Sequence, residues 1–166
     1  MSEPRVLIVD DHQLFRAGVR SELEALLEIA GEASGDNPRL GSSLEATAAE
    51  VEEKHGVPVE VVLVGDRALD PSAEALVAAA GEAMTNAAKF GGGSTVDVYA
   101  ESSDARLQVF VRDRGPGFDL AAVPADRRGV RESIVGRMER HGGRATITSA
   151  QGAGTEVELL LEREGE

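Results

Sequence analysis

An aspartate followed closely by glycines, in Asp113-Arg-Gly-Pro-Gly117, stands where an alternating strand pattern ends. Glycine lacks a Cβ, so the backbone after Asp113 can come close to a ligand. A carboxylate at this place can accept hydrogen bonds from an amino group, such as the exocyclic amine of adenine. An isolated D-x-G-x-G segment is more often a strand followed by a Gly-Pro turn. The binding interpretation therefore depends on the other polar residues of the chain.

A second polar group lies on a predicted helix. Glu82, Asn86 and Lys89 are spaced at i, i+4 and i+7, so their side chains lie on one side of that helix, away from its apolar stripe. The alternative is an ordinary solvent-exposed face. Asparagine is a mediocre residue for a helix interior, which favours a role in binding for Asn86.

A third acidic group, Asp10-Asp11, directly follows the apolar run 5–9. Two carboxylates at the C-terminal end of a buried strand could bind Mg²⁺, because hard cations prefer oxygen ligands. Alternatively, the two residues only end the strand and cap the next helix, which is a common role of aspartate.

Hydrophobic periodicity predicts the elements that position these groups. Helical spacing predicts helices over 14–26, 40–55, 71–90 and 129–140. Strands are expected at 5–9, 57–64, 95–101, 106–113, 144–149 and 155–162. Asp70-Pro71 is a good helix start, with Asp70 as N-cap and proline at the first helical position. Residues 120–128 have few core residues, which predicts a mobile loop.

Composition limits the class of protein. Hydrophobic residues make up 42% of the 166 residues but aromatic residues only 3%, so the core must be aliphatic. A net charge of −13 argues against nucleic-acid binding through a basic surface. The absence of cysteine excludes disulfides and thiolate metal sites. No apolar run reaches membrane-spanning length and the start does not resemble a signal peptide, so a cytoplasmic location is expected.

Four segments in order carry a family resemblance over about residues 38–162: Glu82-Ala-Met-Thr-Asn-Ala-Ala-Lys89, Asp113-Arg-Gly-Pro-Gly117, Gly129-Val-Arg-Glu-Ser-Ile134 and Gly152-Ala-Gly-Thr155. They resemble the N box and the three glycine boxes of the ATP-binding catalytic domain of sensor histidine kinases. This ATPase superfamily, called GHKL or HATPase, includes Hsp90, gyrase and MutL. The chain is most similar to the actinobacterial-type branch with a short lid.

The resemblance implies a fold for residues 37–166. That fold is α+β, a two-layer α/β sandwich of the Bergerat type, with a mixed sheet and helices on one face. Residues 1–36 would form a separate strand-helix unit in front of it.

The resemblance also implies ATP and Mg²⁺ as cofactors and a role for each site residue. Glu82 would position a water molecule or act as a base, Asn86 would bind Mg²⁺, and Lys89 would offset phosphate charge. Asp113 would accept the adenine amine with support from Thr155. Further nucleotide-binding positions would be Gly115, Gly117, Gly129, Arg131, Gly152 and Gly154. Two departures are Phe90, where this branch has histidine, and Arg127-Arg128, where the second box lacks its first glycine.

The front of the chain, Val6 to Val19, resembles the opening strand and helix of a response-regulator receiver domain. In that family the acidic pair binds Mg²⁺ beside a phosphorylated aspartate. The resemblance ends after the first strand-helix unit, so we expect the receiver's phosphoryl chemistry to be absent. Strand 5–9 would have to be covered, either at an edge of the ATPase sheet or by the same strand of a second copy in a homodimer.

The expected function is donation of the γ-phosphoryl group of Mg-ATP to a histidine on a separate dimerisation domain, with a cognate response regulator as the further partner. None of His12, His55 and His141 lies within a long helical hairpin, so the chain would not be a self-sufficient enzyme. Three alternatives stay open. They are a nucleotide- or partner-binding module without kinase activity, similar to anti-sigma factors; a recombined or engineered chimera; and a degenerate response regulator phosphorylated at Asp10, Asp11 or Asp66.

Overall fold

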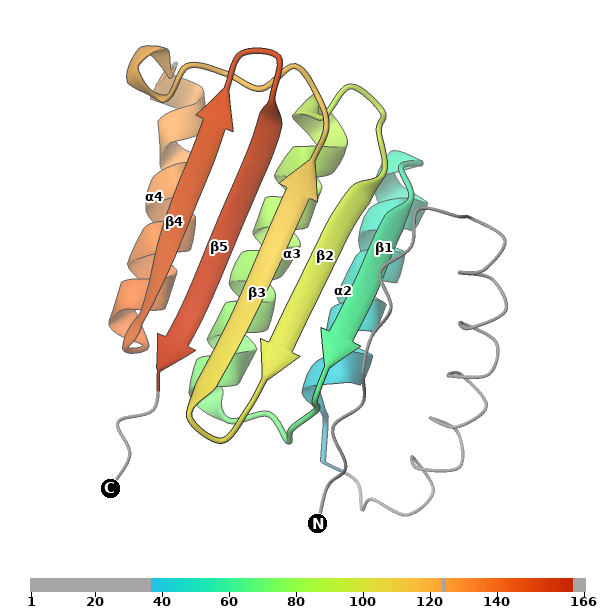
Figure 1. Ribbon diagram of the computed structural model, residues 1–166, viewed down its shortest axis with the longest axis vertical. Helices are drawn as coiled ribbons and strands as arrows, with labels where there is room; N and C mark the ends of the chain where they lie inside the picture. Colours follow the sequence, from blue (N-terminus) through green and yellow to red (C-terminus); the bar gives the residue numbers. More distant parts are fainter. Residues whose placement is uncertain (1–36, 124, 163–166) are drawn as a thin grey trace. The chain divides into compact units, whose positions relative to one another are not determined.

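The computed structural model describes residues 37–123 and 125–162 (Figure 1). The helices and strands of this part of the chain follow one another in the order expected from the periodicity. Their bounds are α2 Leu40–His55, β1 Val59–Val64, α3 Pro71–Phe90, β2 Val96–Ser102, β3 Arg106–Asp113, the 3₁₀ turn η1 Leu120–Ala122, α4 Ala125–Arg140, β4 Gly143–Ala150 and β5 Gly154–Glu162.

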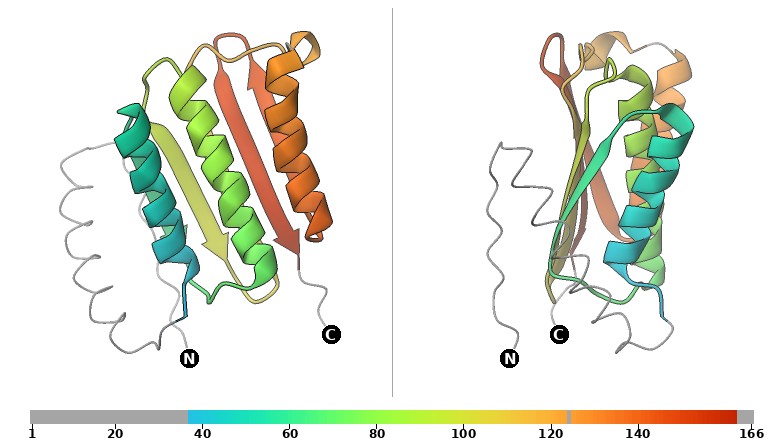
Figure 2. Two further views of the ribbon diagram at one scale, coloured as in Figure 1. Left: turned by 180° about the vertical axis from the view of Figure 1, so that it is seen from behind. Right: turned by 90° about the vertical axis from the view of Figure 1, so that its right-hand side faces the viewer.

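The five strands form one mixed sheet in the order β1-β2-β3-β5-β4. Strands β1 and β2 are parallel, and every other neighbouring pair is antiparallel. Helices α2, α3 and α4 all cover the same face of the sheet (Figure 2). The protein is therefore an α+β sandwich with a mixed sheet and helices on one face, which confirms the predicted fold class.

Strand alternation decides which side chains enter the core. In β3, Leu107, Val109 and Val111 are buried, whereas Gln108 and Phe110 are only partly buried. The buried residues meet the apolar stripes of the helices, where Leu76 and Met84 of α3 are fully buried. No aromatic side chain is among the buried residues of the described chain. The predicted aliphatic core is confirmed.

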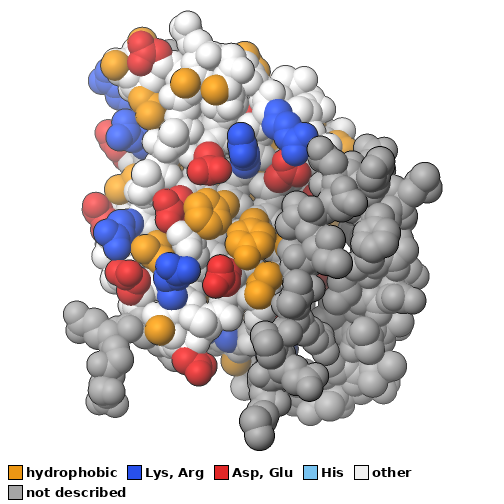
Figure 3. Space-filling model, in the orientation of Figure 1, with side chains coloured by type: hydrophobic (Ala, Val, Ile, Leu, Met, Phe, Trp, Pro, Cys, Tyr) orange, Lys and Arg blue, Asp and Glu red, His pale blue; other side chains and the backbone are white. Residues whose placement is uncertain are grey.

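The sheet face opposite α2, α3 and α4 carries two half-buried aromatic residues. Tyr99 of β2 and Phe110 of β3 are cross-strand partners, and their ring centroids lie 6.4 Å apart. Figure 3 views this face and shows a small group of apolar side chains with charged side chains beside it. Such tilted aromatic pairs stabilise neighbouring strands.

The start of α3 is formed as the sequence predicts. Asp70 is the N-cap, its carboxylate accepts a hydrogen bond from the backbone N–H of Ala73 at 2.8 Å, and Pro71 is the first helical residue. Because this cap satisfies one of the unpaired N–H groups of the first turn, it fixes where the helix begins.

The start of α2 depends on a residue that is distant in sequence. Arg39, the N-cap of α2, makes no side-chain cap. Asp66 takes over this role, since its carboxylate accepts a hydrogen bond from Gly41 N at 3.0 Å and pairs with Arg39 Nε at 2.6 Å. These contacts give Asp66, one of the aspartates considered for phosphorylation, a structural role at a helix N-terminus.

The structure corrects the predicted loop over residues 120–128. Leu120–Ala122 form a 3₁₀ turn, and α4 already begins at Ala125. The turn is capped by Asp119, whose carboxylate accepts a hydrogen bond from Ala121 N at 2.9 Å. The sequence showed no apolar periodicity here, because the turn is stabilised by local hydrogen bonds and not by an apolar stripe.

The predictions for the receiver-like front, including Asp10, Asp11 and strand 5–9, lie outside the described residues. By its contacts the chain divides into the compact units Met1–Asn37 and Pro38–Glu166. The domain boundary at residues 36 and 37 stays a prediction. None of the helices in residues 37–123 and 125–162 has the length and apolar character of a membrane span.

Candidate functional site

A polar row crosses three strands at one end of the sheet. Thr155 of β5 is the cross-strand partner of both Asp113 at the end of β3 and Ser149 near the end of β4. Two residues further into the sheet, the same positions are apolar, where Val157 pairs with Val111 and Ile147. Side chains two residues apart on a strand lie on the same face of the sheet. The polar row therefore lies on the face that the helices cover, at the edge of the apolar core.

Asp113 is the one charged residue among the buried residues of the described chain, with only 4% of its surface exposed. Its Oδ1 accepts a hydrogen bond from Gly115 N at 2.9 Å. Its Oδ2 takes no hydrogen bond from any residue of the described chain. This oxygen is therefore available to a ligand that donates a hydrogen bond to it.

Ser149 orients Thr155, and sequence reasoning missed it. Ser149 Oγ accepts a hydrogen bond from Phe118 N at 2.9 Å, donates one to Gly154 O at 3.0 Å and lies 2.9 Å from Thr155 Oγ1. A hydroxyl has a single proton. Since Ser149 gives its proton to Gly154, Thr155 is the donor in the contact between the two hydroxyls. The lone pairs of Thr155 therefore stay available to a ligand beside Asp113.

The glycine at position 115 allows two backbones to touch. A Cβ at Gly115 would lie 2.6 Å from the backbone of Gly91, just after α3. A Cβ at Gly91 would in turn meet the Cβ of Asp113 at 2.9 Å. The end of α3 is thus packed directly against the Asp113 loop, which brings the polar side of α3 to the same end of the sheet.

Gly117 fixes the loop on the β4–β5 hairpin. Its φ is +60°, a conformation that L side chains rarely adopt, and a Cβ there would lie 2.0 Å from Ala150 O. The backbone of Gly152 donates a hydrogen bond to Pro116 O at 2.6 Å from the other side. Gly115 and Gly117 are thus needed for close contacts within the protein's own backbone. Their role in nucleotide binding stays a prediction.

On α3, the polar side predicted from the spacing is present in the structure. Glu82 and Asn86 are half-buried and Lys89 is exposed. The side-chain amide of Asn86 makes no hydrogen bond with any described residue, so its oxygen is available to a ligand. Lys89 adds the positive charge of the last turn.

Two residues of helix α4 contact the carboxylate of Glu82. Ser133 Oγ donates a hydrogen bond to Glu82 Oε2 at 3.1 Å, and Arg137 Nη2 lies 3.8 Å from the same oxygen. Sequence reasoning missed both residues, although their i, i+4 spacing on a predicted helix was visible.

The remaining predicted residues lie on α4 and on the hairpin. Gly129 does not begin the helix, as the sequence suggested, but lies inside α4, which starts at Ala125. It is exposed, as is Arg131 two residues later, and within the described residues neither makes a hydrogen bond or ion pair with the Asp113 row. Gly152 and Gly154 are in the turn and at the first position of β5, both with positive φ.

For a metal ion, the site offers few protein ligands. No group of three or more His, Cys, Asp or Glu side chains that could hold a metal is present in the described part of the chain. Asn86 supplies one oxygen. This fits a cation that keeps most of its water and binds mainly through the phosphates of a nucleotide, as Mg²⁺ commonly does.

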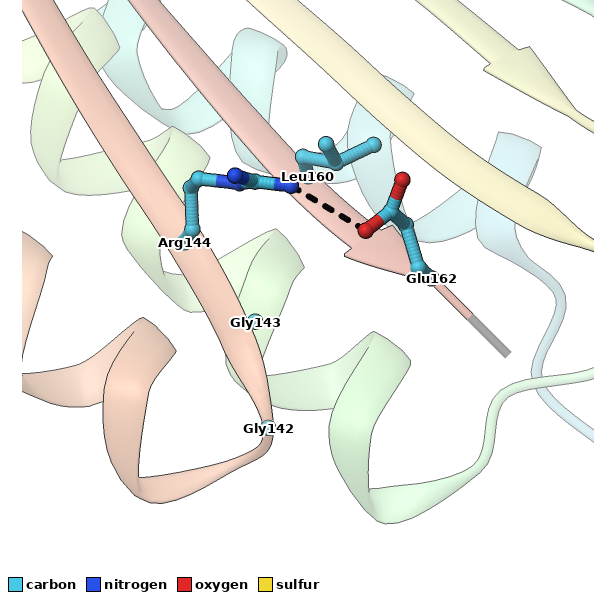
Figure 4. Close-up of a pocket in the computed structure, with 5 residues that line it drawn as sticks. All are labelled: Gly142, Gly143, Arg144, Leu160 and Glu162. Carbon is cyan, nitrogen blue, oxygen red and sulfur yellow. Dashed lines mark hydrogen bonds and ion pairs between the residues drawn. The ribbon is translucent and has the colours of Figure 1, made fainter. Parts of the chain in front are cut away.

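A shallow pocket of about 230 Å³ lies elsewhere on the molecule (Figure 4). It is lined by Gly142, Gly143, Arg144, Leu160 and Glu162, and Arg144 donates a hydrogen bond to Glu162 at 3.1 Å. The register of β4 and β5 puts these residues at the end of the strands opposite to Ser149 and Thr155. The pocket is therefore not part of the candidate site.

Comparison with known proteins gives one family match. Residues 72–165 match the model of the histidine kinase-, DNA gyrase B-, and HSP90-like ATPases, which is more than half of the chain. No curated protein matches the sequence.

Several solved structures share the fold. The mycobacterial sensor histidine kinase MprB aligns with a TM-score of 0.60 and 18% identity, covering 76% of this chain and 96% of that one. The blue-light activated histidine kinase EL346 of Erythrobacter litoralis aligns with a TM-score of 0.62 and 21% identity, covering 86% of this chain and 52% of that one. A histidine kinase domain of EL346 gives a TM-score of 0.55 and 23% identity, with 78% and 64% covered.

Proposed function

Because the chain belongs to the family of histidine kinase-, DNA gyrase B-, and HSP90-like ATPases, we propose that residues 37–166 are the ATP-binding catalytic domain of a two-component sensor histidine kinase. The domain binds Mg-ATP and donates the γ-phosphoryl group to a histidine on a separate dimerisation domain, and a cognate response regulator is the next acceptor. The short segment between Asp113 and α4 supports assignment to the short-lid, actinobacterial-type branch.

The observation that carries the proposal is the free Oδ2 of the buried Asp113. Its neighbour Thr155 offers a second acceptor, so the site has two acceptors side by side and suits an exocyclic amine such as that of adenine. A base with a carbonyl at this position would place oxygen against oxygen. The arrangement thus favours adenine over guanine.

The residues on α3 provide the phosphoryl chemistry in this proposal. Asn86 binds Mg²⁺, Lys89 offsets phosphate charge, and Glu82 acts as the base. The acceptor imidazole nitrogen forms the new N–P bond as the bond between the γ-phosphorus and the bridging oxygen breaks. ADP leaves with that electron pair, and the imidazole proton goes to Glu82.

A binding module without phosphoryl transfer is the second candidate. The observation that favours it is Phe90, which is 45% exposed just after Lys89, where this branch has a histidine. Phenylalanine cannot donate a hydrogen bond to a phosphate or to the lid, so binding could persist without efficient transfer.

Two measurements test the proposal and separate the candidates. Calorimetric titration with ATP, with and without Mg²⁺, tests binding, and transfer of label from γ-labelled ATP to a supplied dimerisation domain tests the kinase function. Binding with transfer supports the kinase domain, and binding without transfer supports the binding module. Absence of Mg²⁺-dependent ATP binding would contradict both.

A further inference from the structure

The carboxylate of Glu82 is contacted at one oxygen only. Ser133 donates to Oε2 at 3.1 Å, and Arg137 Nη2 lies 3.8 Å from the same atom. The other oxygen, Oε1, takes no hydrogen bond from any residue in 37–123 and 125–162. This arrangement suits a base, because the contacts to one oxygen orient the carboxylate while the other oxygen is free to take a proton.

The two contacts come from a rigidly held part of α4. Ile134 follows Ser133, Met138 follows Arg137, and both apolar side chains are fully buried in the core. Ser133 and Arg137 are four residues apart, so they lie on one side of the helix, which packs against α3. The core therefore determines where the hydroxyl and the guanidinium are presented to Glu82.

This pair differs from an ordinary surface ion pair. The side chains of Glu82 and Arg137 are 27% and 38% exposed, whereas those of the surface pair Arg144 and Glu162 are 64% and 62% exposed. Arg137 Nε is moreover buried and has no hydrogen-bond partner in the described chain. An unpaired buried N–H favours a closer approach of the guanidinium to an acceptor, and Glu82 is the acid with which Arg137 forms its ion pair.

We propose that Arg137 and Ser133 are positioning residues that hold Oε2 of Glu82, so that Oε1 faces the proton to be removed. The inference rests on the proposed function, because it concerns the base of that reaction. Neither residue needs to touch the nucleotide. Substitution of Arg137 or Ser133 should therefore lower the rate of phosphoryl transfer and leave the ATP affinity nearly unchanged.

A double-mutant cycle in the full chain tests the proposal, with the variants Glu82→Gln, Arg137→Met and the two combined. Single-turnover transfer to a supplied dimerisation domain gives the rate, and calorimetry gives the ATP affinity. We expect Arg137→Met to slow transfer about tenfold with less than about a twofold change in affinity. In the Glu82→Gln background it should cause no further loss. Arg137→Lys should restore part of the rate, and Ser133→Ala should cause a smaller loss.

Arg140→Met is the matched control, since Arg140 is exposed on the same helix and the charge change is the same. Equal slowing by Arg137→Met with and without Glu82 would overturn the proposal, because a purely structural role would act in both backgrounds. Loss of ATP affinity in Arg137→Met would also overturn it, by showing a direct role in nucleotide binding.

A second arm does not depend on activity. Urea unfolding of the same nucleotide-free variants should show non-additive changes for Glu82 and Arg137, and additive changes would overturn the contact itself. A wild-type chain that binds ATP but transfers no label would overturn the kinase function. The unfolding cycle would still decide whether α4 holds Glu82, so the two failures are distinguishable.

Discussion

Replacing Asp113 by asparagine changes a single oxygen of the buried carboxylate into an NH₂ group and removes its charge. The hydrogen bond from Gly115 N at 2.9 Å requires an acceptor, so the amide oxygen of the substituted side chain must take over the role of Oδ1. The new NH₂ group then occupies the place of Oδ2. It would face the exocyclic amine of adenine, donor against donor.

The expected loss of ATP affinity follows from this geometry. A hydrogen bond to a charged group contributes about 1.5–3 kcal/mol, and each 1.4 kcal/mol corresponds to about a tenfold change in Kd. Because Asp113 is only 4% exposed, solvent weakens this interaction little. We expect the Kd for ATP to rise about 10- to 150-fold. GTP should lose less affinity or gain some, because its 6-carbonyl can accept a hydrogen bond from the new NH₂ group.

Calorimetric titration of wild type and Asp113→Asn with Mg-ATP and Mg-GTP measures both effects. The control is Asp104→Asn, an exposed aspartate in the turn at the far end of β3 with the same change of charge. Thermal unfolding should show that Asp113→Asn is folded, since the Gly115 hydrogen bond is kept. A folded Asp113→Asn variant with wild-type ATP affinity, or with equal losses for ATP and GTP, would refute the role of Asp113 as an acceptor.

Three further predictions concern the metal, the acceptor and the loop. Asn86→Ala should reduce the factor by which Mg²⁺ strengthens ATP binding in paired titrations, and an unchanged factor would mean that another residue holds the ion. The purified chain incubated with γ-labelled ATP should carry no acid-labile label, because His55 ends α2 and His141 directly follows α4. Stable labelling would contradict this and direct attention to His12. In urea unfolding, Gly117→Ala should cost about 2 kcal/mol or more, since its Cβ would lie 2.0 Å from Ala150 O. The control Gly152→Ala, with φ of +78° and nothing within 4 Å, should cost about 1 kcal/mol. Equal costs would mean that the Gly117 loop can move away.

The sequence by itself determined the local features of this protein. The two-residue period placed β3 at Arg106–Asp113 with the correct bounds and put Asp113 at its exit. The Asp70-Pro71 pair determined where α3 begins. Both signals depend on residues close in the chain, namely the alternation of side chains along a strand and the unpaired N–H groups of a first helical turn.

The order of the four boxes also predicted the family and the mixed sheet. The fold class followed from the resemblance, because composition and periodicity alone do not say that β1 pairs in parallel with β2 or that β5 lies between β3 and β4. Strand order depends on pairing between distant segments, which leaves no local pattern.

Only the tertiary structure decided how the site is held together. The hydrogen bond from Ser133 to Glu82 joins residues 51 positions apart, and the bond from Phe118 to Ser149 joins residues 31 positions apart. A Cβ at Gly115 would lie 2.6 Å from the backbone of Gly91, a contact that no local pattern in the sequence predicts. Each of these contacts depends on how helices and loops meet at the edge of the sheet. Side-chain periodicity describes which face of an element is apolar, but not which residue of another element meets it.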